Sequence, residues 1–462
     1  MIHKFIGDKK FYKMVLTISI PIMIQNGITN FVGFLDNIMI GQIGTDQMSG
    51  VSIVNQLMFV FNICIFGIIS AAGIFGAQFY GKGDHEGLRD TFRFRLIVCI
   101  IAGALAILLF ITKGDSLISL YLHEGSATGN IQSTLQFGKK YLLVMMTGLL
   151  PFAIGQAYSS TLRETGETIL PMIAGIIAVL VNLILNYILI FGNFGAPALG
   201  VSGAAIATVI SRFIECAIIV VWTHYNIERN RFIYHAFQTF RIPTQLIKQI
   251  IIKGLPLMLN EALWATAMAI MLQSYSNRGL AVVAGMNISN TINNVFNVVY
   301  IALGDSVAII VGQLLGANKM KEARETDTKL IFFSVSSCFV IGIIMALCAP
   351  IFPAIYNTTD EVRSLATQFI RIIALCMPIC AFLHSSYFTL RSGGKTIITF
   401  VFDSGFAWVI SIPAAFILIH YTTLSIVPLY LICQLLDIFK CILGFVLVKK
   451  GVWLHNIVTS DS

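Results

Sequence analysis

The sequence predicts an all-α integral membrane protein with about twelve transmembrane helices, arranged in two six-helix lobes related by a pseudo-twofold axis along the membrane normal. The first observation is composition: 57% of the residues are hydrophobic and only 11% are charged, whereas a soluble globular protein is about 25% charged. The second is that apolar runs of the roughly 20 residues that cross a bilayer recur along the whole chain. The third is an internal repeat that relates the second half of the chain to the first.

The apolar runs define the spans in chain order. No long polar stretch is left between them for a separate soluble domain. We place the twelve spans at residues 14–38, 48–75, 94–112, 137–160, 169–191, 199–222, 248–274, 281–311, 328–352, 366–388, 397–420 and 425–448.

The distribution of Lys and Arg orients these spans, because both residues are enriched in cytoplasmic loops. With the N-terminus inside, the inner segments carry 23 of the 30 Lys and Arg residues, and the outer segments carry 5. We therefore expect both termini to be cytoplasmic. The net charge of +8 mostly reflects this asymmetry. No basic domain with interleaved aromatic residues is present, so we expect no nucleic-acid partner.

The repeat is visible as matches in the same order at a nearly constant offset. An offset of 235 residues aligns the run Val-Phe-Asn at 60–62 with the same run at 295–297, and Pro21 with Pro256. Further pairs at the same offset are Gln78 and Gln313, Gly81 and Gly316, Arg89 and Arg324, and Thr91 and Thr326. Later in the chain, Pro151 pairs with Pro378 and Leu162-Arg163 pairs with Leu390-Arg391. Such a series indicates a duplication.

The duplication divides the chain into an N-lobe (residues 1–223), a cytoplasmic linker (224–247) and a C-lobe (248–462). With six spans in each lobe, both copies have the same orientation, so the axis that relates them runs along the membrane normal. Transporters are often built in this way.

Asp36 is a carboxylate inside the first span, in the run FVGFLDNIMIG. A charged Asp at the centre of a membrane helix costs about 2.5–3.5 kcal/mol, so it must face a cavity, bind a cation or carry a proton. Its candidate partners are Asn182 and Asn186, which lie four residues apart on one helix face, and the hydroxyl of Thr208. Two alternatives stay open: Asp36 lies at the external interface or caps its helix, and the two Asn residues only join helices by hydrogen bonds.

The second half carries a different set of polar residues, namely Glu261, Asp305, His384 and Asp403. The repeat pairs Glu261 with Asn26 and Asp36 with Met271, so the two lobes are not equivalent. His is a natural proton carrier, although a lone His is also a common structural residue. Local ion pairs are expected between Arg212 and Glu215, and between Asp437 and Lys440.

Together these features resemble the multidrug and toxic compound extrusion (MATE) family. The resemblance rests on the 6+6 spans, Asp36 in the first span, the Gln-x-x-Gly ends of spans two and eight, and the pattern Asn182-x-x-x-Asn186. It implies that Asp36, Asn182, Asn186 and Thr208 form an N-lobe cation or proton site. It also implies that Glu261 takes part in cation or substrate coupling. Some relatives carry Asp at the position of Asn186, so the choice between Na⁺ and H⁺ stays open here.

The function implied by the resemblance is secondary antiport, in which an organic, cationic or amphipathic drug leaves the cell in exchange for H⁺ or Na⁺. The expected partners are drug molecules, the coupling ion and membrane lipid. No cofactor is expected beyond Na⁺ itself. We expect a monomer in the bacterial inner (cytoplasmic) membrane.

Two other functions fit this sequence less well. A flippase for a lipid-linked oligosaccharide, from the same superfamily, would need several basic residues within the spans, and these hold chiefly Arg212 and Arg371. A membrane-embedded enzyme would need clustered His, Asp or Glu near one interface, but the acidic residues are spread over different spans and no HExxH motif is present. We therefore expect a transporter and no enzyme.

Overall fold

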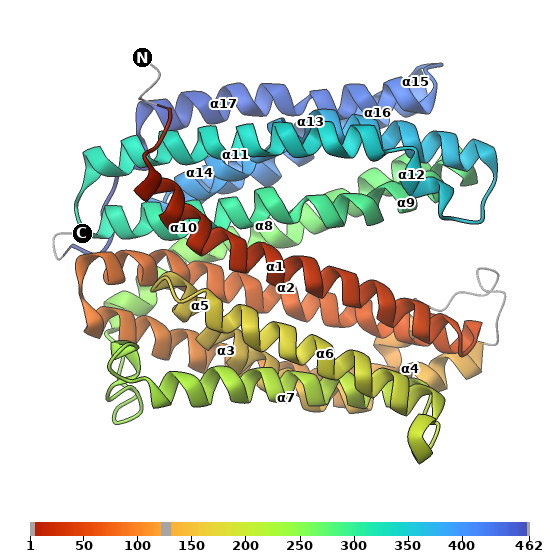
Figure 1. The fold of residues 1–462 in the computed structure, drawn as a ribbon, viewed down its shortest axis with the longest axis horizontal. Coiled ribbons are helices and arrows are strands. Elements are labelled where there is room, and N and C mark those ends of the chain that lie inside the picture. The colour runs from red at the N-terminus through yellow and green to blue at the C-terminus, as the bar shows by residue number, and fades with distance from the viewer. Residues whose placement is uncertain (1–4, 122–130, 460–462) are drawn as a thin grey trace. The chain divides into compact units, whose positions relative to one another are not determined.

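A computed structural model describes residues 5–121 and 131–459 of the chain. Within these residues the secondary structure is helical and contains no strand, and twelve helical segments are long and apolar enough to cross a membrane (Figure 1). The predicted fold class is confirmed.

The first six spans are built from seven α-helices, because α4 and α5 join through the 3₁₀ turn Met146–Gly148 into one span. The helices are α1 (Lys9–Gly41), α2 (Thr45–Lys82), α3 (His85–Ser119), α4 (Ile131–Met145), α5 (Leu149–Glu164), α6 (Ile169–Phe191) and α7 (Val201–Tyr225).

The last six spans contain more interruptions. The helices are α8 (Thr244–Ser276), α9 (Leu280–Phe296), α10 (Val298–Gly316), α11 (Met320–Cys348), α12 (Ile351–Ala354), α13 (Asp360–Ser392), α14 (Thr396–Phe400), α15 (Ile412–Tyr421), α16 (Ile426–Leu435) and α17 (Asp437–Lys450). Two π-helical turns, Val401–Gly405 and Ala407–Ser411, join α14 to α15.

The turns between helices repeat along with the sequence. Gly83, between α2 and α3, has φ +78°, and its repeat mate Asn318, between α10 and α11, has φ +59°. Gly166 and its mate Gly394 have φ +88° and +72°. Only Gly, and less often Asn, adopts this left-handed conformation readily. The duplication therefore extends to the backbone conformation of the turns.

The halves differ at one matched position. α2 runs without a break through Asn62, whereas Asn297, the mate of Asn62, separates α9 from α10. The eighth span, which the sequence predicts as one helix over 281–311, is therefore two helices. The break is slight, because Asn297 itself keeps helical angles (φ −66°, ψ −20°).

The helices group into two compact units, which we call the N-terminal unit (Ile24–Gly76 and His85–Lys248) and the C-terminal unit (the described residues of Met1–Met23, Ala77–Asp84 and Gln249–Ser462). In the N-terminal unit α6 packs along α7, and α3 packs along α5. In the C-terminal unit α13 is central and contacts α9, α10, α11 and α17. The core of that unit includes Phe11 of α1 as well as Leu303, Phe388 and Trp453.

The repeated Gln-x-x-Gly motif forms a close crossing of α2 and α10 inside the C-terminal unit. A Cβ atom at Gly81 would overlap the carbonyl group of Gln313, and a Cβ atom at Gly316 would overlap the carbonyl group of Gln78. Each copy of the motif thus supplies the Gly that the other copy's backbone needs. The motif therefore allows the two helices to pack closely, which could not be predicted from its position in the sequence.

Each unit ends in a segment that folds back on it. In the N-terminal unit, Arg93 of α3 donates hydrogen bonds of 2.7 Å to the backbone oxygens of His235 and Ala236, in the predicted linker. In the C-terminal unit, the N–H of Ile457 donates to Oε1 of Gln78 at 2.8 Å, and the side chain of Asn456 donates to the carbonyl of Gly316 at 3.1 Å.

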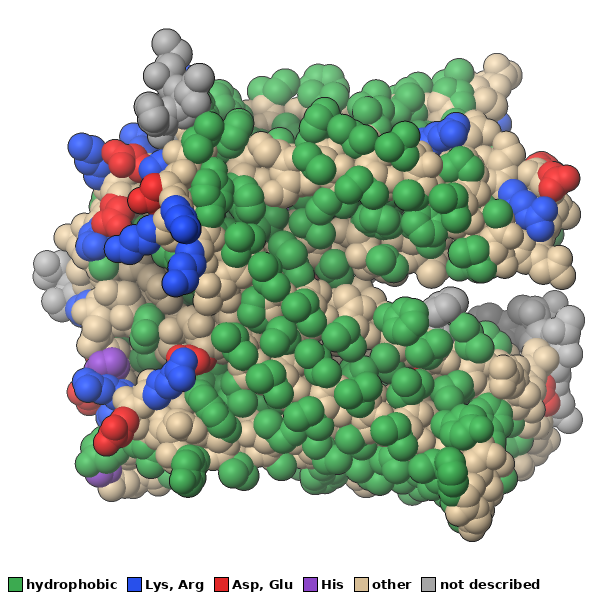
Figure 2. Space-filling model, in the orientation of Figure 1, with side chains coloured by type: hydrophobic (Ala, Val, Ile, Leu, Met, Phe, Trp, Pro, Cys, Tyr) green, Lys and Arg blue, Asp and Glu red, His purple; other side chains and the backbone are tan. Residues whose placement is uncertain are grey.

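The surface of the helices is apolar along their flanks and charged near their ends (Figure 2). On α3, Leu105, Leu108 and Ile111 are more than half exposed, at 60%, 58% and 67%. Water-exposed patches of this kind are rare on soluble monomers, and lipid tails are their natural neighbours. The chain is a multi-pass membrane protein.

Candidate functional site

Asp36 lies in the last third of α1, and its carboxylate meets the polar face of α6. Nδ2 of Asn186 donates to Oδ1 of Asp36 at 2.6 Å. Asn182 is one turn earlier on α6, and its amide lies 3.1 Å from both Asp36 oxygens. Asn182 and Asn186 are buried. The helical spacing of four residues, read from the sequence, therefore places both amides against one carboxylate.

Thr208 of α7 completes this group, because its Oγ1 lies 3.2 Å from the Asn182 amide. The structure thus brings together Asp36, Asn182, Asn186 and Thr208 within the N-terminal unit. In the described part of the chain, no Lys or Arg forms an ion pair with Asp36. Oδ1 of Asn186 is buried and has no hydrogen-bond partner.

The orientation of the Asn182 amide depends on the state of Asp36, because a bare carboxylate only accepts hydrogen bonds. With its nitrogen toward Asp36, Asn182 donates to both carboxylate oxygens at 3.1 Å, and its oxygen faces Thr208. With its oxygen toward Asp36, it accepts from Asn186 at 3.2 Å and its nitrogen donates to Thr208. The second arrangement brings three oxygen atoms together, which requires a proton or a cation between them.

The donor set therefore fits a proton or a hard cation. Carboxylate and amide oxygens are the ligands that such cations prefer, and the unpartnered oxygen of Asn186 adds one more. Among the described residues no group of three His, Cys, Asp or Glu side chains is close enough to hold a metal ion.

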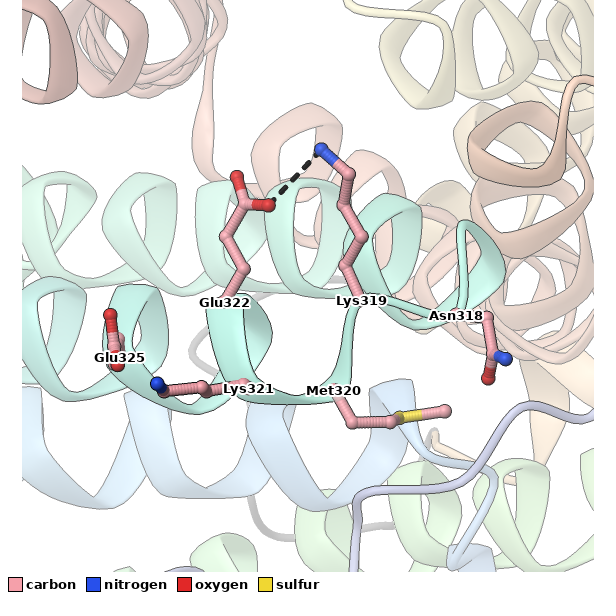
Figure 3. Close-up of a pocket in the computed structure, with 6 residues that line it drawn as sticks. All are labelled: Asn318, Lys319, Met320, Lys321, Glu322 and Glu325. Atoms are coloured by element: carbon pink, nitrogen blue, oxygen red, sulfur yellow. Dashed lines mark ion pairs between the residues drawn. The ribbon is translucent and has the colours of Figure 1, made fainter.

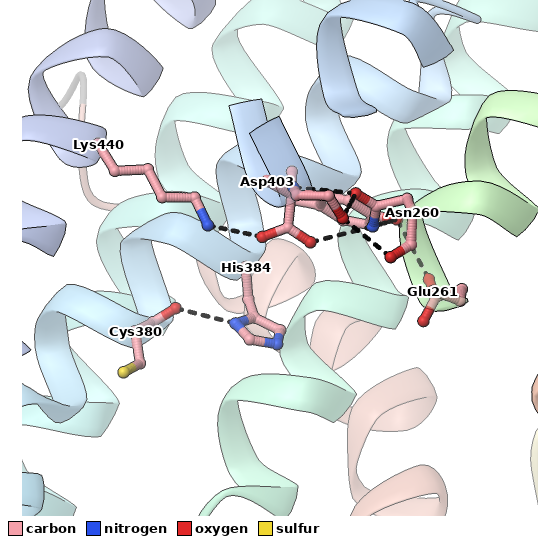
Figure 4. Close-up of polar contacts among 8 residues, drawn as sticks. Asn260, Glu261, Cys380, His384, Asp403 and Lys440 are labelled. Atoms are coloured by element: carbon pink, nitrogen blue, oxygen red, sulfur yellow. Dashed lines mark hydrogen bonds and ion pairs between the residues drawn. The ribbon is translucent and has the colours of Figure 1, made fainter. Parts of the chain in front are cut away.

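A second polar cluster lies in the C-terminal unit, around Asp403 (Figure 4). Its Oδ1 accepts from Nζ of Lys440 at 2.6 Å, and its Oδ2 accepts from Nδ2 of Asn260 at 3.0 Å. Oδ1 of Asn260 in turn accepts from the backbone N–H of Ser404 at 3.2 Å and from its hydroxyl at 2.7 Å. Three helical segments, α8, the first π turn and α17, meet through these bonds.

Glu261 joins this cluster through Tyr387. The Tyr387 hydroxyl donates to Oε1 of Glu261 at 3.4 Å, and Nδ2 of Asn260 lies 3.4 Å from the same hydroxyl. His384 lies one turn before Tyr387 on α13, where its Nδ1 is 3.2 Å from the carbonyl of Cys380. Lys440 pairs with Asp403, and Glu261 forms no ion pair among the described residues.

Asp305 lies in α10 beside Gly304. A Cβ atom at Gly304 would lie 2.7 Å from the Phe388 ring and 3.8 Å from Cβ of His384, so this part of α10 packs on α13. The roles of Glu261, Asp305, His384 and Asp403 in coupling stay predictions.

Among the described residues, neither of the two predicted local ion pairs forms a direct contact. Lys440 pairs with Asp403 instead of Asp437, because the lysine side chain reaches from α17 to the π turn. The guanidinium of Arg212 lies over the Phe152 ring at 4.9 Å, and no ion pair with Glu215 is formed among the described residues.

Sequence reasoning missed four members of the second cluster: Asn260, Tyr387, Ser404 and Lys440. Helical spacing offered a signal for Tyr387, because it lies three residues after His384. Asp403 and Ser404 sit in a π-helical turn, which adds a residue to the turn and is frequent at functional sites. Nothing in the run VFDSGF marks that turn, so its partners could not be predicted.

A surface hollow at the start of α11 has no relation to these clusters (Figure 3). Asn318, Lys319, Met320, Lys321, Glu322 and Glu325 line it. Lys319 and Glu322 form an exposed ion pair of 3.0 Å there. This hollow is a solvated turn between helices and includes none of the predicted site residues.

Comparison with known proteins agrees with the duplicated architecture. The model of the MatE family matches residues 21–188 and 256–417, so the matches begin at Pro21 and Pro256, which the repeat aligns. A probable multidrug resistance protein NorM of Thermotoga maritima is 24% identical over 444 residues, which cover 96% of this chain and 93% of the relative.

Two further comparisons extend this result. The multidrug resistance protein MdtK of Yersinia pseudotuberculosis is 24% identical over 418 residues, covering 88% of this chain and 87% of that protein. A solved transporter of the MOP superfamily from Pyrococcus furiosus superposes with a TM-score of 0.86 at 18% identity, over 97% of both chains. Because the family model covers well over half of its residues, the chain belongs to the MatE family.

Proposed function

We propose that this protein is a secondary antiporter that exports organic, cationic or amphipathic compounds in exchange for H⁺ or Na⁺. The relatives named multidrug resistance proteins support the substrate class. The observation that carries the coupling is the carboxylate of Asp36, which two buried amides hold without a cationic partner in the described residues.

The Asn182 amide gives this site two states. When Asp36 is ionised and empty, the amide nitrogen faces it and stabilises the negative charge. When Asp36 carries a proton or binds Na⁺, the Asn182 side-chain amide is rotated by 180°, so that its oxygen lies 3.1 Å from the carboxylate instead. The energetic difference between the two arrangements links occupancy of the site to the packing of α1 on α6 and α7.

Antiport requires that each ligand weaken the binding of the other, and this coupling is reciprocal. The ion favours one conformation of the transporter and the organic substrate favours the other. In the C-terminal unit, we assign the supporting role to Glu261, which the Tyr387 hydroxyl orients. Asp403 is already neutralised by Lys440, so we expect it to organise the cluster and to leave ion exchange to Glu261.

The cellular setting follows from the charge distribution and the bacterial relatives. We place the protein in the inner membrane with both termini in the cytoplasm, because 23 of the 30 Lys and Arg residues then lie in inner segments. We propose that it works as a monomer.

The test is ethidium efflux from cells that express the wild type or Asp36→Asn at equal membrane levels. Each strain is measured with and without a proton uncoupler, and with Na⁺ replaced by K⁺. We expect efflux in Asp36→Asn to fall to the rate of cells without the protein, because a neutral amide neither takes up a proton nor supplies the negative charge that attracts Na⁺. Asp115→Asn is the matched control, since Asp115 is an exposed acid paired with Lys139 at the end of α3.

The ion conditions then identify the driving ion. Loss of wild-type efflux with the uncoupler alone indicates H⁺, and loss on removal of Na⁺ alone indicates Na⁺. Wild-type rates in Asp36→Asn would overturn the assignment of coupling to Asp36.

A further inference from the structure

Asp327 is a buried acid that the proposed mechanism does not use. It lies two turns into α11, on a stripe of buried residues at positions 323, 327, 330, 334 and 338. Its side chain is only 1% exposed. Glu322 and Glu325, the other acids in this part of α11, are exposed. Asp327 therefore occupies a core position of the helix, where an ionised carboxylate is costly unless it is paired.

No cation pairs with Asp327 in the described part of the chain. The helices that surround this part of α11 are α1, α10, α13 and α17. Their titratable side chains on the nearby segments, with those of α11 itself, are Lys9, Lys10, Lys13, Asp305, Arg324, Glu325, Lys329, His384, Arg391, Lys449 and Lys450. None of them forms an ion pair with Asp327 among the described residues. The nearest along α13, Arg391, lies over the Phe388 ring at 5.2 Å.

The hydrogen bonds around Thr389 indicate where the proton is. Oγ1 of Thr389 lies 2.5 Å from Oδ1 of Asp327 and 2.9 Å from the carbonyl oxygen of Ser385. A hydroxyl has one hydrogen and can donate it fully to only one acceptor. If Asp327 carries a proton, it donates to Thr389, which donates to Ser385, and both contacts are satisfied. If Asp327 is ionised, it has at most one donor, and its other oxygen, Oδ2, has none.

The N-terminal unit contains an equivalent threonine, and the group that donates a hydrogen bond to its hydroxyl is an arginine. Thr161 is the repeat mate of Thr389, and its hydroxyl donates to the carbonyl of Ala157 at 3.0 Å, where Ala157 is the mate of Ser385. Thr161 accepts its second bond from Nη1 of Arg95 at 2.6 Å. When a threonine hydroxyl gives its one hydrogen to the carbonyl oxygen one turn earlier, its oxygen can only accept the second hydrogen bond. The second partner must therefore be a donor. Among the described residues, the group that takes this place at Thr389 is Asp327.

We propose that Asp327 is a proton-binding site in which a neutral carboxylic acid donates a hydrogen bond to Thr389 across the closed α11–α13 interface. An ionised Asp327 would have at most one donor in this closed interface, so loss of the proton disfavours the closed interface. The site is distinct from the Asp36 group, which lies in the other unit.

The test is infrared spectroscopy of the purified full-length protein in lipid, at neutral pH. A protonated carboxylic acid has a carbonyl stretching band that a carboxylate lacks. We expect the wild type minus Asp327→Asn difference spectrum to contain this band. Asn keeps the size of the side chain and can donate to Thr389, so the variant should fold. Asp115→Asn is the control, and its difference spectrum should contain only carboxylate bands.

A second variant tests the hydrogen bond itself. Thr389→Val removes the acceptor and keeps the shape, so the acid band should remain and move to the higher frequency of an unbonded acid. Thr389→Ser should restore its position. The proposal is overturned if Asp327→Asn removes carboxylate bands instead, or if Thr389→Val leaves the acid band unmoved. Neither readout depends on transport, so the proposed function can fail or hold separately.

Discussion

The α3–α5 interface of the N-terminal unit and the α11–α13 interface of the C-terminal unit are formed by helices that the repeat aligns. The two interfaces differ in their buried charged residues. In the first, Nη2 of the fully buried Arg95 donates to Glu164 at 2.7 Å. In the second, the repeat places Leu330 and Ser392 at those two positions. The buried acid Asp327 of this second interface stands where the first has Phe92.

The two copies therefore share their backbone conformation but differ in the positions of their charged residues. The matched turns keep left-handed angles at Gly83 and Asn318, and the threonine bonds at positions 161 and 389 both reach the carbonyl one turn earlier. The groups that we propose to bind protons or ions sit on this shared backbone at unmatched positions. A functional residue in one half therefore does not predict one in the other.

The largest expected effect comes from breaking the buried pair of the N-terminal unit. Arg95→Leu, which introduces the residue of the other half, leaves Glu164 buried without its cation. We expect a loss of about 3–5 kcal/mol of stability, measured as a lower unfolding temperature of the protein in detergent.

The double variant Arg95→Leu/Glu164→Ser introduces both residues that the other interface has at these two positions. It should recover most of the lost stability, because replacing both partners of a buried pair is often nearly neutral. A double variant as unstable as Arg95→Leu alone would mean that the two interfaces differ in shape as well as charge.

A smaller effect should appear where the halves are equivalent, at the crossing of α2 and α10. Gly81→Ala and Gly316→Ala each place a methyl group against the opposite backbone, so we expect each to cost about 1–3 kcal/mol. The measurement is again the unfolding temperature, and Gly27→Ala is the control because no atom lies within 4 Å of a Cβ there. Clearly unequal effects of the two substitutions would contradict the symmetric crossing.

The smallest effect concerns the C-terminal segment, which folds back on the C-terminal unit. Burial, with the nearby charges of Lys395 and Lys253, lowers the pKa of His455 below its usual 6.5. The released segment therefore binds a proton as the pH falls through about 6.5 while the docked segment does not, so acid favours release and the docking gains strength above that pH. The protection of the Ile457 and Val458 amides against hydrogen exchange, corrected for the slower intrinsic exchange in acid, should be lower below that pH than above it.

His455→Gln should remove this pH dependence and leave the two amides strongly protected both below and above that pH. Equal protection of the wild-type amides on both sides of that pH would show that His455 does not control the segment.

Much of the fold could be predicted from the sequence because hydrophobic length and repetition act over long stretches. The twelve spans and the duplicated turns follow from them. The break at Asn297 could not be predicted, because its mate Asn62 lies in an unbroken helix. The π turns around Asp403 are set by packing against α8 and α17, which local sequence does not record.

The site was predictable where partners share a helix and unpredictable where they do not. Asn182 and Asn186 are four residues apart, so one helix face holds both against Asp36. Lys440 reaches Asp403 from another helix, and its closeness to Asp437 in sequence pointed to the wrong partner. Asp327 was missed because the charged residues around it in KMKEARETDTK are typical of a solvated helix start.

The most direct test of the central claim uses purified protein in lipid vesicles, with an H⁺ gradient and an Na⁺ gradient applied separately. Uptake of an organic cation is measured for the wild type and for Asp36→Asn, together with substrate binding in the absence of any gradient. We expect one of the two gradients to drive concentrative uptake by the wild type. We expect neither gradient to drive uptake by Asp36→Asn, although that variant still binds substrate. Concentrative uptake by Asp36→Asn at the wild-type level would contradict the claim that Asp36 couples the ion to transport.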